Sequence, residues 1–320
     1  MIPILLGILL LVFTISYFTP GDPVAAMLGS NYSEELYQQK MAEFGLDKPF
    51  VERYVSYVWG IVTRFDFGKS FVTGASVGGE MVRRMGVTIR MGVLSVICSL
   101  IIGVSFGVLS ATKQHSALDT TVTVFAMFIA AMPGFWLGLM LILIFALRLG
   151  LFPATGIDTW RHWVLPVMTQ ALGALALLTR MTRSSVLEVI RQDHTRTARS
   201  KGLSEGEIIR KHVLKNSLIP VITIVGMQIG MVMAGSVIVE SIFSIPGLGS
   251  YMLRGITSRD YPIINGCVLL MSTCICVMNL VTDLAYGFVD PRIKAQYSTK
   301  SSQKRLKKSL EKAERREAAA

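Results

Sequence analysis

Few residues in this chain have the types and spacing that chemistry requires, and none completes a known reaction motif. Gly68-Lys69-Ser70 resembles the end of a phosphate-binding loop, in which the Lys and Ser side chains hold phosphate and Mg²⁺. That loop needs another glycine five residues before Gly68, where this chain has Thr63. Asp66-Phe67-Gly68 lacks the partner motifs of a kinase. We therefore expect no catalytic residue and no nucleotide-hydrolysing site in this chain.

The histidines and cysteines also lack the neighbours that nucleophilic catalysis or metal binding needs. They are His115, His162, His194, His212, Cys98, Cys267, Cys274 and Cys276. The histidines have no paired nucleophile, and neither HExxH nor GxSxG occurs. The cysteines lie inside apolar runs, where cysteine packs as a small hydrophobic residue. Because Cys274 and Cys276 are spaced wrongly for zinc, we expect no metal site and no cofactor bound by this chain.

The elements that carry these residues are long apolar runs. Hydrophobic residues make up 52% of the 320 positions, and a run of about 20 of them crosses a bilayer as a helix. The predicted spans are 2–18, 87–110, 121–147, 163–182, 217–243 and 263–288. The first lacks the basic flank and small-residue cleavage site of a signal peptide, so we expect it to be an uncleaved span. The sequence thus predicts an all-α integral membrane protein with about six transmembrane helices.

Positive charge is concentrated in one internal loop and in the C-terminal tail. Residues 180–216 carry nine Lys or Arg and residues 291–320 carry ten, whereas 148–162 and 244–262 carry two each. Because basic loops stay on the cytoplasmic side, we expect the 180–216 loop and both termini to be cytoplasmic. The net charge of +11 also raises the question of nucleic acid, but no nucleic-acid-binding motif accompanies it.

Several polar side chains fall inside the predicted spans, among them Gln170, Gln228, Asn265 and Asn279. Polar groups at membrane depth usually face a bundle interior or a watery path. They also form hydrogen bonds that hold helices together. The sequence leaves both interpretations open, and these four residues are our candidates for the translocation path. Gly226 and Gly230 are expected to permit close helix approach on the fifth span.

The spans divide the chain into four parts. These are a first transmembrane helix 1–18, an extracytoplasmic helical segment 19–86, a five-helix membrane core 87–290 and a basic cytoplasmic tail 291–320. In the second part, Glu34 to Lys40 and Val51 to Thr63 have helical periodicity. The core includes the charged loop 186–220, which is patterned as two short helices around a break at Gly202. In that loop, Ser204 and Glu207 fit a capping box.

The loop 186–220 has two interpretations. An ordered helix pair between two spans is longer than most connections, which favours a docking role. The alternative is a solvated amphipathic helix that lies on the membrane surface.

Specific strings in this loop carry a resemblance. They are Arg196-Thr197-Ala198-Arg199-Ser200-Lys201-Gly202-Leu203-Ser204 and Asn216-Ser217-Leu218-Ile219-Pro220. They resemble the cytoplasmic docking motif of binding-protein-dependent ABC importer permeases, and more narrowly the dipeptide/oligopeptide/nickel permease family. Other strings agree: Pro20-Gly21-Asp22-Pro23, Asp66-Phe67-Gly68, Pro133-Gly134-Phe135-Trp136, Pro246-Gly247-Leu248-Gly249, Arg259-Asp260-Tyr261-Pro262 and Asp290-Pro291-Arg292-Ile293. The chain departs from the family at Gly86, where a proline is usual, and at Arg90, which is often Glu.

The resemblance implies the type I importer permease fold and a location in the bacterial inner membrane. It implies four kinds of partner: a second homologous permease, two ABC ATPase subunits, an extracytoplasmic substrate-binding protein and the lipid membrane. ATP and Mg²⁺ would be bound by the ATPases, and no nucleic acid is involved. The docking residues that it implies are Thr197, Ala198, Lys201, Gly202, Leu203, Ser204 and Glu205. Peptides are the implied cargo, with nickel or a metal chelate as the alternative.

Two other classes of protein fit the sequence less well. A membrane enzyme would need clustered intramembrane acids or histidines, whereas Glu240 and Asp283 stand alone near span ends. A receptor or structural membrane protein would not account for the patterned 186–220 loop.

Overall fold

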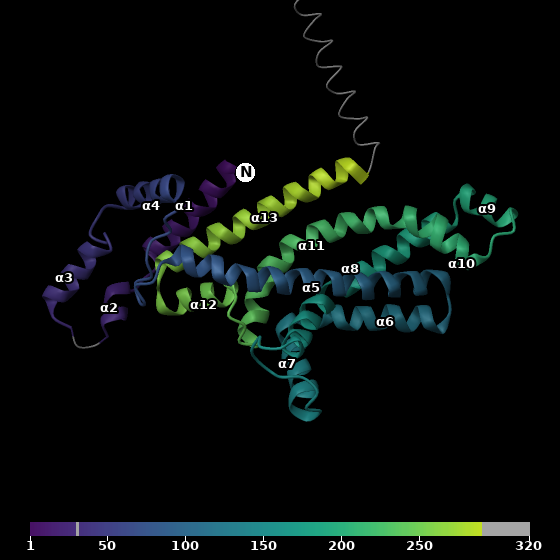
Figure 1. Cartoon of the computed structure of the whole chain (residues 1–320), viewed down its shortest axis with the longest axis horizontal. Helices are drawn as coiled ribbons and strands as arrows, with labels where there is room; N and C mark the ends of the chain where they lie inside the picture. Colours follow the sequence, from purple (N-terminus) through teal and green to yellow (C-terminus); the bar gives the residue numbers. More distant parts are fainter. Residues whose placement is uncertain (30–31, 290–320) are drawn as a thin grey trace, which may run out of the picture.

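The computed structural model describes residues 1–29 and 32–289, and this part of the chain is helical, apart from a β-bridge between Lys69 and Ser76 (Figure 1). The shorter helices are α1 (Ile2–Phe18), α2 (Pro23–Leu28), α3 (Glu34–Glu43), α4 (Phe50–Arg64), α6 (Ala117–Ala131), α7 (Gly134–Leu141), α9 (Asp193–Ser200), α10 (Glu205–Ile208) and α12 (Leu248–Ser258). The longer helices are α5 (Val77–Thr112), α8 (Trp160–Ile190), α11 (Leu214–Ile242) and α13 (Tyr261–Val289). The all-α prediction is confirmed for the described residues. So are the helices predicted near 34–40 and 51–63.

The four long helices form a bundle along the long axis of the molecule (Figure 1). Helix α5 packs on α8, and α11 packs on α8, α13 and α5. Helix α1 lies against α13, and α6 lies against α8. Helices α9 and α10 project at one end, here called the loop end. Helices α2, α3 and α12 lie at the opposite end, here called the cap end.

Glycines let the long helices approach closely. A Cβ built on Gly107 of α5 would lie 2.4 Å from the Cβ of Thr182 on α8. A Cβ built on Gly226 of α11 would lie 2.1 Å from the Cγ2 of Thr282 on α13. Neither distance is possible for a real side chain, so both helix pairs can pack this closely because glycine has no Cβ. Close approach at small residues is how membrane helices gain packing energy when lipid supplies no hydrophobic drive.

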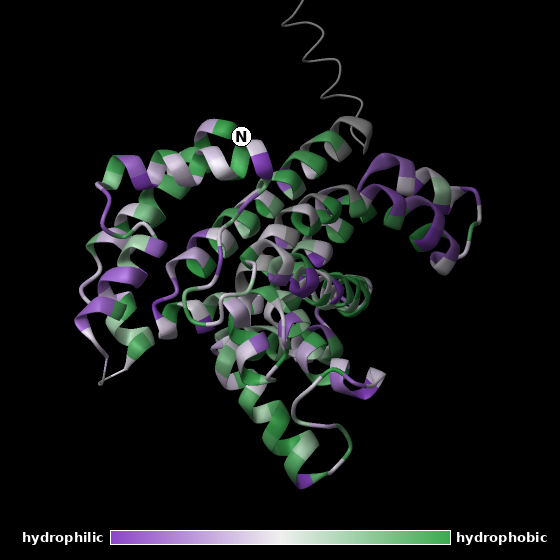
Figure 2. Cartoon of the chain, turned by 60° about the vertical axis from the view of Figure 1, so that its left-hand side comes forward, coloured by the Kyte–Doolittle hydropathy of each residue, from purple (hydrophilic) through white to green (hydrophobic). Residues whose placement is uncertain are grey.

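The sides of the bundle suit a lipid environment. Three described helices are long and apolar enough to cross a bilayer, namely Val77–Thr112, Trp160–Ile190 and Tyr261–Thr282. Helix α1 is apolar but has only 17 residues. Figure 2 shows hydrophilic residues on α9 and α10 at the loop end and also on the short helices of the cap end, with hydrophobic ones along the bundle. The number of about six spans stays a prediction.

The third predicted span, 121–147, is not one straight helix. Helix α6 ends at Ala131, and α7 with the π-helical turn Ile142–Arg148 continues at an angle of 105°. Pro133 precedes the first residue of α7, and Met132 before it is extended at φ −82° and ψ 132°. A residue before proline is driven out of the helical region by the proline ring. Pro133 therefore breaks the span that hydropathy alone joins.

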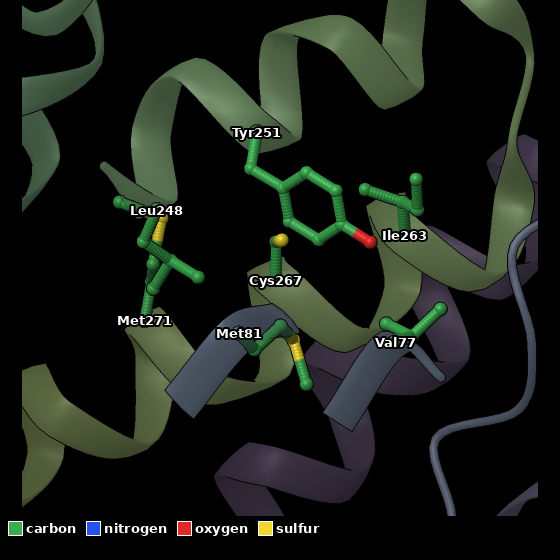
Figure 3. Packing of buried hydrophobic residues seen from close by; sticks show 7 residues of the cluster. All are labelled: Val77, Met81, Leu248, Tyr251, Ile263, Cys267 and Met271. Atoms are coloured by element: carbon green, nitrogen blue, oxygen red, sulfur yellow. The ribbon is translucent and has the colours of Figure 1, made fainter. Parts of the chain in front are cut away.

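A hydrophobic core holds the cap end together (Figure 3). Its buried members are Val77, Met81, Leu248, Tyr251, Ile263, Cys267 and Met271. They come from α5, α12 and α13, so this core joins the start of α5 to the last two helices of the described chain. Cys267 is fully buried there, as expected of a packing residue. Helix α5 starts at Val77, inside the segment predicted as 19–86.

Two predicted features lie outside the described residues. These are the basic tail 291–320 and the string that starts at Asp290.

Candidate functional site

The predicted break in the 186–220 loop forms a sharp corner at the loop end. Helix α9 ends at Ser200, and α10 begins at Glu205 and runs through a π-helical turn, Ile209–Val213, into α11. Gly202 between them has φ +79°, in the left-handed region that favours glycine. No atom lies within 4 Å of a Cβ built on Gly202. Glycine is favoured here by the backbone angle and not by crowding from the described residues.

Buried apolar residues anchor the corner to the bundle. The cluster comprises Ala111, Val186, Val189, Ala198, Ile208 and Val213. It joins the ends of α5 and α8 to both short helices. The buried Thr195 hydroxyl adds a hydrogen bond of 2.9 Å to the Val189 carbonyl oxygen. The corner is therefore packed against the bundle as a folded unit.

The predicted docking residues divide into two groups. Thr197, Lys201, Gly202, Ser204 and Glu205 are exposed on the outer side of the corner. Ala198 is buried in the anchoring cluster, and Leu203 packs against it, half-buried. The exposed group is available to another molecule, whereas Ala198 and Leu203 orient it.

An ion pair spans the break. The Arg199 Nε and Nη2 atoms donate to the two carboxylate oxygens of Glu205 at 2.6 and 3.2 Å. The hydrogen bond from Arg199 lowers the pKa of Glu205 below its usual range. The predicted capping box is wrong: Ser204 is the N-cap residue, but its side chain makes no capping bond. Glu207 pairs instead with Lys211 at 2.6 Å, one turn further along.

Two of the four path candidates bridge helices. Gln170 on α8 donates to the Val232 carbonyl oxygen of α11 at 2.7 Å and accepts from Ser95 of α5 at 3.2 Å. Asn265 on α13 accepts from Ser16 of α1 at 3.4 Å. This is the geometry of the interhelical alternative.

The other two path candidates differ in exposure. Gln228 is buried within α11, at 6% exposure. Asn279 is exposed on α13, and its Oδ1 would lie 3.6 Å from a Cβ built on Gly230. The structure therefore does not gather the four candidates into one described cavity.

A groove of about 900 Å³ lies between α6 and α8 near the loop end. Its walls are formed by Thr123, Ala126, Met127, Ala130, Ala131, Ala176, Thr179, Arg180, Arg183, Ser184, Leu187, Glu188 and Arg191. The two Arg183 nitrogens Nε and Nη2 donate to Asp119, each at 2.9 Å, which ties α6 to α8. This groove was not predicted from the sequence, because its lining mixes small apolar residues of α6 and α8 with arginines of α8.

A buried carboxylate at the cap end was also missed. Glu240 of α11 is fully buried and accepts from the Thr88 hydroxyl of α5 at 2.6 Å. It also accepts from the Ser250 N–H in the first turn of α12 at 2.9 Å. The Gly249 N–H and the Ser236 hydroxyl bond to it as well. A carboxylate suits a helix N-terminus, where backbone N–H groups lack partners inside the helix.

A second buried carboxylate ties the segment after α4 to the start of α13. Asp260 Oδ2 accepts from the buried Ser70 hydroxyl at 2.6 Å and from the Val72 N–H at 3.3 Å. Next to it, a Cβ on Gly21 would lie 1.7 Å from a guanidinium nitrogen of Arg259. Strings that are far apart in the sequence, around 20–23, 66–70 and 259–262, therefore meet at the cap end.

Among the described residues, no group of three or more His, Cys, Asp or Glu side chains could hold a metal ion. The features that are present are an apolar helix bundle, an anchored polar corner at one end and buried carboxylate contacts at the other. Together they define an all-helical membrane protein whose two ends differ in polarity and in packing.

The chain belongs to the family described as binding-protein-dependent transport system inner membrane component, which matches residues 103–295. The N-terminal family of the same membrane components matches residues 1–92. The dipeptide transport system permease protein DppB of Escherichia coli K12 is 38% identical, over 92% of this chain and 96% of that protein. The oligopeptide transport system permease protein AppB of Bacillus subtilis is 39% identical, over 91% and 96%.

Solved structures show the same fold. A chain of the MetNI methionine ABC transporter, in an inward-facing conformation, aligns with a TM-score of 0.57 at 19% identity. The alignment covers 66% of this chain and 96% of that one. A chain of an amino acid ABC transporter solved with histidines aligns with a TM-score of 0.52 at 13% identity. The predicted permease fold and family are thus confirmed.

Proposed function

We propose that this chain is a permease subunit of an ATP-driven peptide importer and forms half of its translocation path. The observation that carries the coupling role is the α9–Gly202–α10 corner. Its buried face is fixed to α5 and α8, while Thr197, Lys201, Ser204 and Glu205 face outward. The relatives in Escherichia coli and Bacillus subtilis are dipeptide and oligopeptide permease proteins. Their names favour peptides over nickel as the cargo.

The working unit contains several further components. A second homologous permease completes the path, and two ATPase subunits bind at the loop ends. An extracytoplasmic binding protein delivers cargo at the cap end, so both termini and the loop end are cytoplasmic. ATP and Mg²⁺ are held by the ATPases, and this chain is not itself an enzyme.

The corner transmits motion because it is short and packed. When the ATPases close on ATP, a groove in one of them displaces α9 and α10. Coupling needs a two-state element that both sites bias. Since the corner shares a hydrophobic cluster with the ends of α5 and α8, its displacement moves those helices and opens the path toward the cap end. The groove between α6 and α8 is our candidate for the inner part of that path, with Gln228 and Asn279 as further polar candidates.

Replacing Gly202 by valine tests this proposal. A left-handed backbone costs a residue with a Cβ about 1–2 kcal/mol, and a β-branched one is a marked outlier there. We expect Gly202→Val to distort the corner while membrane insertion and pairing with the second permease stay normal. Because allosteric couplings are typically about 1–3 kcal/mol, stimulation of ATP hydrolysis by loaded binding protein should fall by about tenfold. Peptide uptake into liposomes should fall with it.

Gly202→Asn is the matched control, because asparagine tolerates the left-handed region. It should keep most of the stimulation if the backbone angle is what matters. Failure of both variants would indicate that a closely fitted ATPase groove excludes any side chain at this position. Wild-type stimulation and uptake in Gly202→Val would mean that the corner is a passive linker, and the docking assignment would be abandoned.

A further inference from the structure

Helix α4 presents an apolar stripe that no described part of the chain covers. Val51, Val55, Trp59 and Val62 are exposed to 67%, 56%, 66% and 68%. Their spacing of three or four residues places them on one face of the helix. A contiguous open apolar patch of this kind marks an interaction surface in a folded protein.

The neighbouring face of α4 packs on α1. The Phe50 ring lies 5.1 Å from the Tyr17 ring, centroid to centroid, and the Tyr54 ring lies 5.5 Å from the Phe13 ring. The Tyr54 hydroxyl donates to the Leu6 carbonyl oxygen at 3.3 Å. Leu6 and Tyr17 are about 16 Å apart along α1, at 1.5 Å of rise per residue. Helix α4 therefore crosses α1 near Phe13, whose ring also lies 5.6 Å from the Phe50 ring and 6.0 Å from the Tyr57 ring.

Helix α1 is itself an apolar helix with an open side. No charged residue occurs between Ile2 and Phe18. One side of α1 packs on α13, whereas Leu10, Leu11 and Ile15 remain exposed to 43%, 58% and 58%. In a family of inner membrane components, lipid is what covers such a surface. The stripe on α4 belongs to a helix that packs directly against this one.

The polar residues of α4 lie beside the stripe. Glu52, Ser56 and Thr63 form a polar edge, about a quarter of a turn from the centre of the stripe. Beyond that edge, Ser56 and Arg53 line a cavity of about 650 Å³ between the cap-end segment and α13. The helix is thus amphipathic, with a polar side formed by this edge and by Arg53 at the cavity, and with its apolar stripe open. This division is typical of helices that lie partly in lipid with a tryptophan near the interface.

We propose that α4 is immersed in the lipid leaflet at the cap end, beside α1, with Val51, Val55, Trp59 and Val62 against acyl chains. In this arrangement α4 gives the 19–76 segment an attachment to the bilayer, in addition to its contacts with α1 and with Asp260 at the start of α13.

Nitroxide labels on adjacent residues test this immersion. The labels are placed on Val55→Cys and Val62→Cys in the stripe and on Ser56→Cys and Thr63→Cys on the polar side, after replacement of the four native cysteines. In the assembled transporter in phosphatidylcholine liposomes, collisions with oxygen and with a water-soluble nickel chelate are compared. We expect the ratio of oxygen to nickel collisions to be several-fold higher at 55 and 62 than at 56 and 63.

Two results would overturn the proposal. Equal and high nickel accessibility at all four positions would mean that the stripe faces water. Immobile labels at 55 and 62 that neither reagent reaches would mean that a protein partner, such as the second permease, covers it.

Trp59 fluorescence gives a second readout that needs no cysteine replacement. With Trp136, Trp160 and Trp163 changed to phenylalanine, brominated acyl chains should quench the remaining emission more than twofold. Quenching by aqueous acrylamide in place of the brominated lipid would contradict the proposal.

Discussion

The two ends of the helix bundle are held together in different ways. At the cap end, the buried Glu240 and Asp260 join segments that are 152 and 190 residues apart in the sequence, through Thr88 and Ser70. At the loop end, the partners across the break are close neighbours, since Arg199 and Glu205 are six residues apart. Their side chains remain 40% and 63% exposed.

The contacts at the two ends differ in the free energy that their opening costs. Buried carboxylates with several donors resist opening, because each donor that loses its acceptor costs about 1–3 kcal/mol. An exposed ion pair is worth about 0–1 kcal/mol. The cap end is therefore a frame in which α5, α11 and α12 stay fixed to one another and move as one body. The loop end is a small unit whose cluster and ion pair can shift together, as a docking element requires.

Among the variants that test this difference, removal of the Glu240 carboxylate should cause the largest loss of stability. In Glu240→Ala, the Thr88 hydroxyl and the Ser250 N–H lose their shared acceptor. With at least two buried donors unpaired, we expect a loss of about 3 kcal/mol in stability. The measurement is the fraction of purified protein that stays monodisperse after heating across a temperature series.

Ser241→Ala is the control for this change. Ser241 is the next residue on α11, and among the described residues its hydroxyl bonds within its own helix, to the Val237 carbonyl oxygen. Heat resistance should be close to wild type. Equal losses of heat resistance in the two variants would mean that the Glu240 contacts do not stabilise the cap end. The cap end would then be held no more firmly than the loop end.

Asp260→Ala should have the next largest effect, confined to the attachment of the 66–76 segment. The buried Ser70 hydroxyl and the Val72 N–H lose their acceptor. Because about 1.4 kcal/mol is a factor of ten, local opening should rise by about tenfold. The measurement is the rate of tryptic cleavage after the exposed Lys69 in the reconstituted protein.

Asp66→Ala serves as its matched control. Asp66 is exposed and, within 1–29 and 32–289, its side chain accepts from the nearby Gly68 N–H at 2.8 Å. Its replacement should leave the cleavage rate within about twofold of wild type, as expected of a surface change. A faster cleavage in Asp66→Ala than in Asp260→Ala would show that the loop's own turn, and not the buried contact, holds this segment.

The loop end was predictable from sequence and the cap end was not. The break at Gly202 follows from a glycine between two short periodic segments, and such signals are local. The contacts of Glu240 and Asp260 depend on which distant segments pack beside them, and hydropathy gives no information on that pairing. Sequence analysis consequently described Glu240 as standing alone. A single sequence does offer one usable signal, which is an acidic residue within an otherwise largely apolar helix end.

Local rules also failed where two of them compete. Pro133 breaks the span predicted at 121–147, because the rule for residues before proline overrides the hydropathy that continues beyond it. Glu207 could close a capping box with Ser204 or pair with Lys211, and the structure has the pair. Both residue types permit either bond, so spacing alone does not decide between them.

The smallest effect is expected from the ion pair across the loop-end break. Arg199→Ala and Glu205→Ala should each raise hydrogen exchange of the α9 backbone amides by about twofold, since exposed pairs contribute about 0.5 kcal/mol. The double variant should equal either single one.

The pair should also respond to pH in a defined direction. The hydrogen bond from Arg199 lowers the pKa of Glu205, so its contribution is complete above the ordinary glutamate pKa of about 4.3. It is lost as the pH falls through the lowered value. Wild-type and Glu205→Gln protein should therefore differ in α9 protection at pH 7 and converge at strongly acidic pH. No difference at pH 7 would mean that the corner is held by its buried cluster alone, and a difference that persists unchanged under acid would mean that Glu205→Gln acts by something other than the lost charge.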